Sequence, residues 1–136
     1  MLRPQPLRGF GRVNSALGFY MSSFNDNLDV IDNKPLKIMA KVSLLKTEEG
    51  GRHTPVVGGV AFRPNHNFGS AENRNFYIGQ INYEKDDLVK PGEERTVEIV
   101  FLNVRGLREL LRVGTMWRIQ EGPTLIAIGE VLKVDT

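Results

Sequence analysis

Few side chains in this sequence could carry out acid–base or metal chemistry. Its two histidines are His53 and His66, and it has no cysteine. The lack of cysteine excludes disulfides, thiol nucleophiles and every cysteine-containing zinc or iron–sulfur site. Two histidines could bind a metal or act as an acid–base pair, but neither has a carboxylate at a spacing that such a site requires. We therefore expect both histidines to lie in loops with their hydrogen bonds satisfied.

The acidic residues include three adjacent pairs, at positions 48–49, 86–87 and 93–94, and each pair lies where a turn is predicted. Paired carboxylates can act in general acid–base catalysis, but solvated turn charges explain these pairs better. No serine has the context of a nucleophile elbow. The glycine pairs Gly50-Gly51 and Gly58-Gly59 lack the lysine and hydroxyl of a phosphate-binding loop. We therefore expect no enzymatic activity, no cofactor, no metal and no bound nucleotide.

Length and composition indicate one ordinary globular domain. The chain has 136 residues, of which 40% are hydrophobic and 25% charged, as in a typical soluble protein. No apolar run reaches the ~20 residues needed to span a bilayer, so we expect no membrane-spanning segment. The net charge of +2 is too small to indicate nucleic-acid binding by itself, because phosphate affinity requires a concentrated basic patch.

Residues 1–35 differ in composition from the rest and are predicted to form an N-terminal arm. The arm contains Arg3, Arg8 and Arg12 before the first carboxylate, Asp26. Its arginines and aromatic residues could bind RNA by charge and stacking, or the arm could pack on the following domain because it is rich in large apolar side chains. An organelle-targeting segment is a further possibility, but the early prolines and glycines suit a targeting helix poorly. We expect a retained arm and a cytoplasmic protein, with an organelle matrix as the alternative.

Residues 36–136 are predicted to be all-β. Apolar residues alternate with polar ones over 36–44 and 97–101 and around Trp117, and 76–81 is rich in aromatic and β-branched residues. Residues 124–134 are almost continuously apolar, which predicts a strand covered on both faces. Only 106–113 has helical spacing, and it is long enough for one short helix. Short strands separated by glycine and proline turns favour a sandwich or a closed barrel.

Four sequence motifs resemble the third domain of elongation factor Tu. The first is the run from Glu48 to Pro55, which reads EEGGRHTP. Three others follow in the same order as in that family: Phe62-Arg63-Pro64, the turn Val89–Glu93, and a closing segment that contains WRIQEG at 117–122. The resemblance covers about residues 36–134. It implies a closed antiparallel barrel of about six strands, here separated from the GTPase domain of that factor.

In that family the third domain contacts the T-stem of aminoacyl-tRNA and packs against the GTPase domain. The resemblance places the RNA- or partner-contacting positions at six residues, namely Arg52, His53, Arg63, Asn65, Glu121 and Gly122. Arginines and amides suit the shallow minor groove of A-form RNA. The sequence departs from the family at Asn65, where the family has glutamine, and at Pro123, which replaces a glycine and removes a backbone N–H.

Two functions are therefore predicted for this non-catalytic domain. The first is a protein-interaction domain that uses or mimics the third-domain surface of elongation factor Tu, with a role in translation. The second is an RNA-binding domain that retains the tRNA-facing side. A continuous basic face joining Arg52, Arg63, Arg74 and Arg118 would favour RNA, whereas an exposed apolar patch would favour a protein partner. Alternatively, Arg52 pairs with a nearby carboxylate and only shapes its loop.

Overall fold

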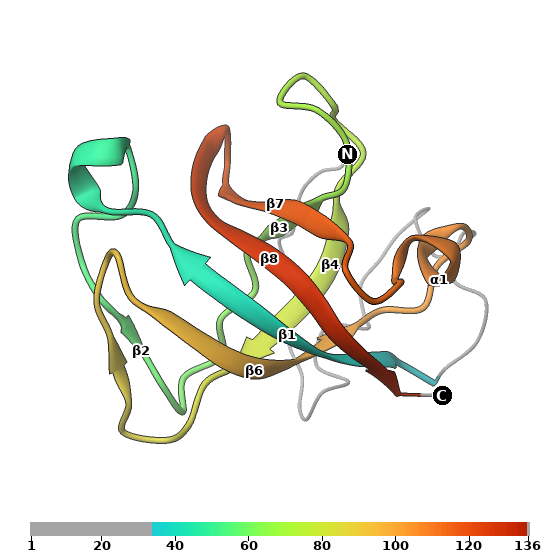
Figure 1. The fold of residues 1–136 in the computed structure, drawn as a ribbon, viewed down its shortest axis with the longest axis horizontal. Coiled ribbons are helices and arrows are strands. Elements are labelled where there is room, and N and C mark those ends of the chain that lie inside the picture. The colour runs from blue at the N-terminus through green and yellow to red at the C-terminus, as the bar shows by residue number, and fades with distance from the viewer. Residues whose placement is uncertain (1–33, 136) are drawn as a thin grey trace.

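The computed structural model describes residues 34–135, and they form a closed antiparallel β-barrel (Figure 1). In order around the barrel the strands are β1 (Leu36–Leu44), β6 (Glu94–Phe101), β4 (Tyr77–Asn82), β3 (Asn65–Asn67), β7 (Met116–Glu121) and β8 (Thr124–Asp135). The prediction of a closed barrel of about six strands is confirmed. The predicted arm, with Arg3, Arg8 and Arg12, lies outside the described residues.

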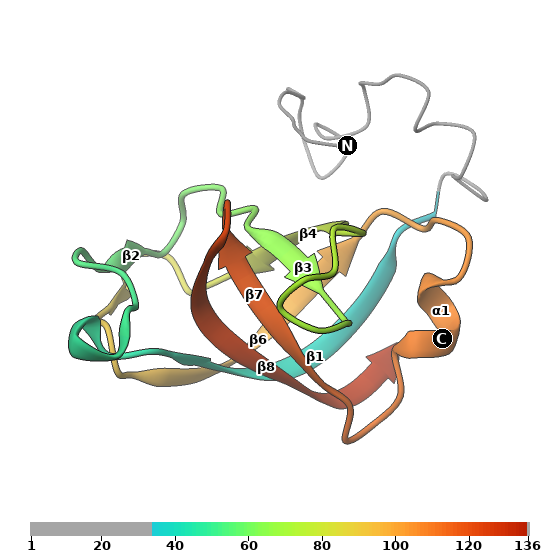
Figure 2. The same cartoon turned by 90° about the horizontal axis from the view of Figure 1, so that it is seen from above.

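Four shorter elements complete the described fold. Strands β2 (Val56–Val57) and β5 (Leu88–Val89) pair with each other in a small separate sheet. The 3-10 helix η4 (Thr47–Glu49) follows β1, and helix α1 (Leu107–Leu110) follows β6. Figure 2 shows β2 and α1 at opposite ends of the barrel. In the described part of the chain, no helix is long and apolar enough to cross a membrane.

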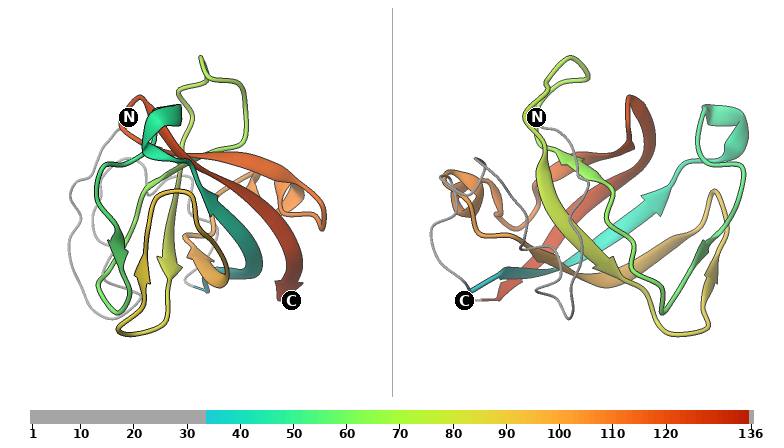
Figure 3. Two further views of the ribbon diagram at one scale, coloured as in Figure 1. Left: turned by 60° about the vertical axis from the view of Figure 1, so that its left-hand side comes forward. Right: turned by 180° about the vertical axis from the view of Figure 1, so that it is seen from behind.

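Along β1, buried side chains that line the barrel interior alternate with side chains on the outer surface. Ile38, Ala40 and Val42 are almost completely buried, and the residues between them lie on the outer surface. This is the period-two pattern of a strand with one face in the core. The strand pairs with β6 along one edge and with β8 along the other, which closes the barrel. Two views of these strands are compared in Figure 3.

The turns form where glycine and proline predict them. Gly92 has φ +92°, and the Glu93 N–H donates to the Lys90 carbonyl at 3.0 Å. Pro91 fixes φ at the position before Gly92, as a type II turn requires. The predicted short helix is also confirmed, because α1 spans four residues within 106–113.

Two sequence predictions are wrong. Strand β8 is not covered on both faces, because Leu132 is 40% exposed and Ile128 is only half-buried. A β-bulge occurs at this point, since Met39 pairs with Lys133 whereas Ala40 pairs with Val131. His66 does not lie in a loop. It is fully buried in β3, where it pairs with Tyr77 of β4 on one side and with Ile119 of β7 on the other.

An aromatic cluster fills the part of the barrel interior beside β3. Phe68 stacks on Trp117 with ring centroids 5.1 Å apart, and Phe101 makes edge contacts with both His66 and Trp117. Two glycines make room for these rings. A Cβ on Gly129 would lie 2.6 Å from the Trp117 ring, and a Cβ on Gly79 would lie 2.7 Å from the Phe101 ring.

Candidate binding surface

The predicted site residues at 52 and 121 meet in space although they are far apart in sequence. The Arg52 guanidinium forms an ion pair with the Glu121 carboxylate, which joins the loop after η4 to the end of β7. All three guanidinium nitrogens of Arg52 donate, since Nε and Nη2 bond oxygens of Thr54 and Nη2 also bonds the Pro55 carbonyl. The guanidinium carbon also lies 5.7 Å from the centre of the Phe62 ring. Arg52 therefore shapes its own loop.

Replacing Arg52 with alanine is expected to lower the free energy of unfolding by about 1–2 kcal/mol, since several charge-assisted hydrogen bonds are lost together. Replacing Glu121 with glutamine is expected to lower it by about 1 kcal/mol or less, because that carboxylate is largely exposed. Urea denaturation of the two variants measures the difference. Equal effects would show that Arg52 acts only through Glu121.

The predicted site residue Gly122 lies in the two-residue turn between β7 and β8. Glu121 pairs with Thr124, so Gly122 and Pro123 are the central residues, and Gly122 has φ +59°. Proline cannot adopt the positive φ that a type I′ turn needs at its second central position, so the turn is type II′. The Gln120 side-chain amide donates to the Gly122 carbonyl at 3.1 Å and fixes this turn onto the outer face.

Arg63 and Asn65 lie on the same side of the barrel as that turn. Asn65 pairs with Gln120 across the β3–β7 ladder. The Arg63 Nε donates to the Gln80 side-chain oxygen at 2.9 Å. A row of amides continues from there, because Gln80 donates to Asn82 at 2.8 Å and Asn82 donates to Glu98 at 3.0 Å. Arg63 is thus held at one end of a polar row along β4 and β6.

A second amide network lies beside it and was not predicted from sequence. Asn67 is fully buried, and its Nδ2 donates to Gln120 Oε1 at 2.8 Å and to the Ser70 carbonyl at 2.9 Å. The Asn73 amide donates to the Asn67 Oδ1 at 2.7 Å. The loop between β3 and β4 is therefore fixed over the outer face of the ladder. Arg118 borders this network and donates to Gln120 at 3.2 Å.

The four arginines proposed as an RNA-binding face are held in different ways. Arg52 is neutralised by Glu121, while Arg63 bonds the amide of Gln80 on β4 and Arg118 bonds the amide of Gln120 on its own strand. Arg74 bonds carbonyl groups of its own loop, those of Ala71 and Glu72. The structure thus brings together Arg52, Asn65, Glu121 and Gly122. The predicted site residue His53 is an exposed loop residue next to Arg52.

Among the described residues, no group of three or more histidine, aspartate or glutamate side chains could hold a metal ion. His66, the buried histidine, has its two ring nitrogens engaged. The Trp117 indole N–H donates to Nδ1 at 3.0 Å, and Nε2 lies 3.0 Å from the Gly79 carbonyl. Since a carbonyl only accepts, Nε2 carries the proton and the ring is neutral. Burial lowers the pKa of His66 to about 4. The imidazole is therefore part of the core.

An ion-pair network holds the turn between β5 and β6. Arg95 bonds both the Asp87 and Glu93 carboxylates, at 2.9 and 3.2 Å. The hydrogen bond from Arg95 lowers the pKa of Asp87. The Glu93 carboxylate accepts a hydrogen bond from the backbone N–H of Lys90, and this bond lowers the pKa of Glu93. The acidic pairs at 86–87 and 93–94 thus include two carboxylates that hold a turn together.

Exposed apolar side chains gather at both ends of the barrel. At the end with β2 they are Val57 and Leu88, which face each other across the β2–β5 pair, and nearby Val60. On the side toward α1 they are Val113 in the turn before β7, Met116 at the start of β7 and Leu132 on β8, exposed by 70%, 62% and 40%. No model of a known protein family matches the sequence of this chain.

Proposed function

We propose that this chain is a non-catalytic protein-interaction domain. The observation that carries the proposal is the presence of exposed apolar side chains at both ends of a barrel whose interior is well packed. The core residues are almost completely buried, so the exposed apolar groups are not required to fill the barrel. Contiguous apolar groups that remain in contact with water favour association with another protein.

The arginines of the predicted RNA-binding face support this function less well. Arg52 is neutralised by Glu121 and donates from every guanidinium nitrogen within the domain. Contact with a phosphate would therefore compete with the bonds that shape the loop. RNA binding remains the second candidate, because the arginines at 63 and 118 border rows of amides, and amides and arginines suit the minor groove of A-form RNA.

The resemblance to the third domain of elongation factor Tu makes the translation machinery the first place to seek a partner. In that family a barrel of this kind packs against a GTPase domain and contacts tRNA. This chain would use the corresponding surface, or mimic it, without hydrolysing GTP itself.

Proximity labelling with the full chain tests the proposed function. We expect a reproducible set of neighbouring proteins that persists after ribonuclease treatment. The double variants Val57→Glu with Leu88→Glu and Val113→Glu with Met116→Glu disrupt one apolar end each. We expect at least one of them to reduce labelling of this set by about tenfold, as for loss of a buried interface contact.

The variant Lys85→Glu with Lys90→Glu is the control for altered charge at the end with α1, since both lysines flank β5 at the opposite end. Thermal melting of each purified protein checks that it is folded. A set of neighbours that is unchanged in both apolar variants would contradict the proposal. Neighbours that disappear with ribonuclease, together with tRNA binding that requires Arg63 and Arg118, would establish the RNA-binding function instead.

A further inference from the structure

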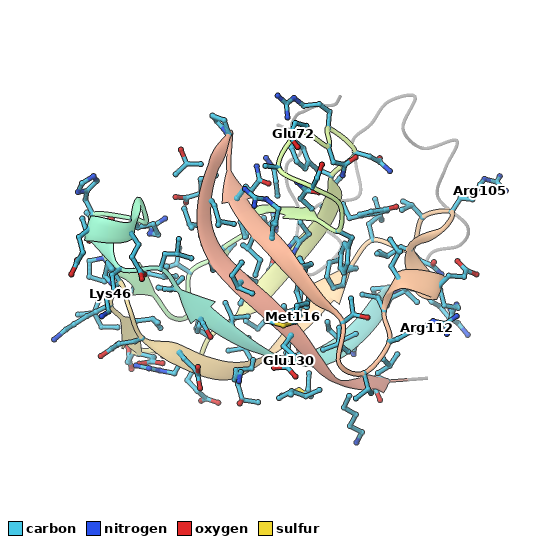
Figure 4. All side chains as sticks on the ribbon, turned by 45° about the horizontal axis from the view of Figure 1, so that its top comes forward. Lys46, Glu72, Arg105, Arg112, Met116 and Glu130 are labelled. Atoms are coloured by element: carbon cyan, nitrogen blue, oxygen red, sulfur yellow. The ribbon has the colours of Figure 1, made fainter. Side chains whose placement is uncertain are left out.

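Three exposed arginines surround helix α1. They are Arg105, Arg108 and Arg112, and the same stretch contains only one acid, Glu109. None of the three forms an ion pair with a carboxylate within residues 34–135. The Arg112 Nε donates to the backbone carbonyl of Glu109 rather than to its carboxylate. Figure 4 shows Arg105 and Arg112 extending outward at this end of the barrel.

An exposed apolar residue, Val113, directly follows Arg112 in the chain. The Thr115 N–H donates to the Arg112 carbonyl at 2.9 Å, which forms a turn with Val113 at its centre. The Gly114 N–H donates to the Val131 carbonyl at 2.8 Å, and the Val131 N–H donates to the Thr115 carbonyl at 2.9 Å. These bonds place Val113 next to Leu132 at the end of β8. Met116 follows at the start of β7.

Arginines and exposed apolar residues are thus grouped by the stretch from α1 to β7 and by its bonds to β8, and we name this group the α1 surface. It consists of Arg105, Arg108, Arg112, Val113, Met116 and Leu132. Glu130, labelled near Met116 in Figure 4, pairs with Met116 across the ladder and forms an ion pair with Lys41 at 3.5 Å. Lys133 is a further exposed cation on β8. Three arginines outnumber the one acid of the same stretch, Glu109, and the nearby Glu130 is already paired with Lys41.

We propose that the α1 surface docks an acidic peptide segment of a protein partner, with aspartate or glutamate opposite the arginines and aliphatic side chains against Val113, Met116 and Leu132. The proposal rests on the proposed protein-interaction function and specifies the chemistry of the partner. Guanidinium groups bind carboxylates through paired hydrogen bonds, and apolar contacts exclude water from those bonds. The α1 surface has no aromatic residue on which a base could stack, so RNA would leave its apolar half uncovered.

The sequence of this chain offers a second occupant for the same chemistry. Residues 24–33, which lie outside the described part, contain three aspartates together with Phe24, Leu28, Val30 and Ile31. The experiment must therefore separate a partner peptide from this segment of the chain itself.

An array of short synthetic peptides tests the proposal with the full chain. In the array, Asp or Glu alternates with Leu, Ile or Phe at varied spacing, and matched peptides carry Asn or Gln at the acidic positions. We expect binding of acidic peptides only, with affinity that falls as salt is raised. Fluorescence anisotropy with the best peptide then compares variants. Arg108→Glu with Arg112→Glu should weaken binding by about tenfold or more, while Lys85→Glu with Lys90→Glu, the same charge change elsewhere, should not.

Charge reversal in the peptide provides the decisive control. A peptide with Lys or Arg at the acidic positions should bind the Arg108→Glu, Arg112→Glu variant better than the original chain. Failure of every peptide in the array, or equal binding of the Asn and Gln versions, would overturn the proposal. The proposal would also be overturned if binding of RNA or of phosphatidylserine vesicles required Arg108 and Arg112 whereas binding of the peptides did not.

Two further outcomes are distinguishable. If acidic peptides bind only after Asp26, Asp29 and Asp32 are changed to asparagine, the segment of the chain itself is the occupant and the partner proposal fails. If the labelled neighbours are lost with Val113→Glu and Met116→Glu but retained with Arg108→Glu and Arg112→Glu, the acidic chemistry fails. The protein-interaction function then still stands.

Discussion

The free energy of unfolding should fall by about 3 kcal/mol as the pH is lowered from 7 to 4, because His66 is neutral in the folded barrel. Its pKa lies at about 4 in the folded chain, against an ordinary value of 6.5. Each pKa unit corresponds to about 1.4 kcal/mol. Between these two pH values the unfolded chain binds more protons than the folded chain, so acid favours unfolding. The stabilisation is fully present above pH 6.5 and is lost as the pH falls to about 4.

The geometry explains why the folded barrel resists protonation. A second ring proton would be placed on Nδ1, which accepts the Trp117 indole N–H at 3.0 Å. Two donors would then face each other in a fully buried site. The pKa values of Asp87 and Glu93 are lowered. Protonation of these two carboxylates therefore changes the free energy of unfolding mainly below pH 4.5. The range from pH 4.5 to 6.5 therefore reports chiefly on His66.

Urea denaturation at a series of pH values measures this effect. The His66→Gln variant should have a nearly flat profile between pH 4.5 and 6.5, because an uncharged amide replaces the ring. The Trp117→Phe variant keeps the histidine and removes the opposing donor, so the pKa of His66 should rise. A nuclear magnetic resonance titration of the His66 ring checks the assignment. A ring that titrates near 6.5 in the folded protein would contradict the prediction.

Replacing Gly129 with alanine is expected to lower the free energy of unfolding by about 1–3 kcal/mol, as for overpacking in a closely packed core. Gly129 pairs with Trp117 across the β7–β8 ladder, and the indole lies over its Cα. An added Cβ would be 2.6 Å from two ring atoms. The ring cannot move aside easily, because Phe68 stacks on it and His66 accepts its N–H.

A double-mutant cycle tests whether the indole is the cause. The smaller ring in Trp117→Phe leaves room for the new methyl group. Gly129→Ala should therefore be less destabilising in that background than in the original chain. Leu132→Ala, on the same strand but exposed, should change stability little. Additive effects of Gly129→Ala and Trp117→Phe would show that the clash with the ring is not responsible.

Much of the barrel follows from local sequence patterns. In the strand around Ile38 and Val42 every second residue is apolar and buried, and Pro91-Gly92 encodes a turn that needs one positive φ. Strand β3 could not be predicted in this way, because it has three residues and contains a histidine between two asparagines. Its position depends on pairing with β4 and β7, which lie later in the chain. For this reason the sequence alone predicts a loop position for His66.

The surfaces were less predictable than the strands. The resemblance brought Arg52 and Glu121 into one candidate site, but their ion pair depends on which loops meet at the end of the barrel. The amide network of Asn67 and Gln120 depends on register, since one residue of slip would place these side chains in the core. The α1 surface combines the turn before β7 with the bulge in β8, and no local pattern marks a bulge at Leu132.

The position of β1 in the barrel has a consequence for how the chain reaches its fold. Both of its hydrogen-bonding partners, β6 and β8, come from the second half of the chain, and Lys37 pairs with Asp135. Pairing over such a separation makes folding slow. During synthesis β1 emerges well before either partner, and it presents an alternating apolar strand with two open edges, which is a template for aggregation. A chaperone that binds extended segments would have its target in this strand.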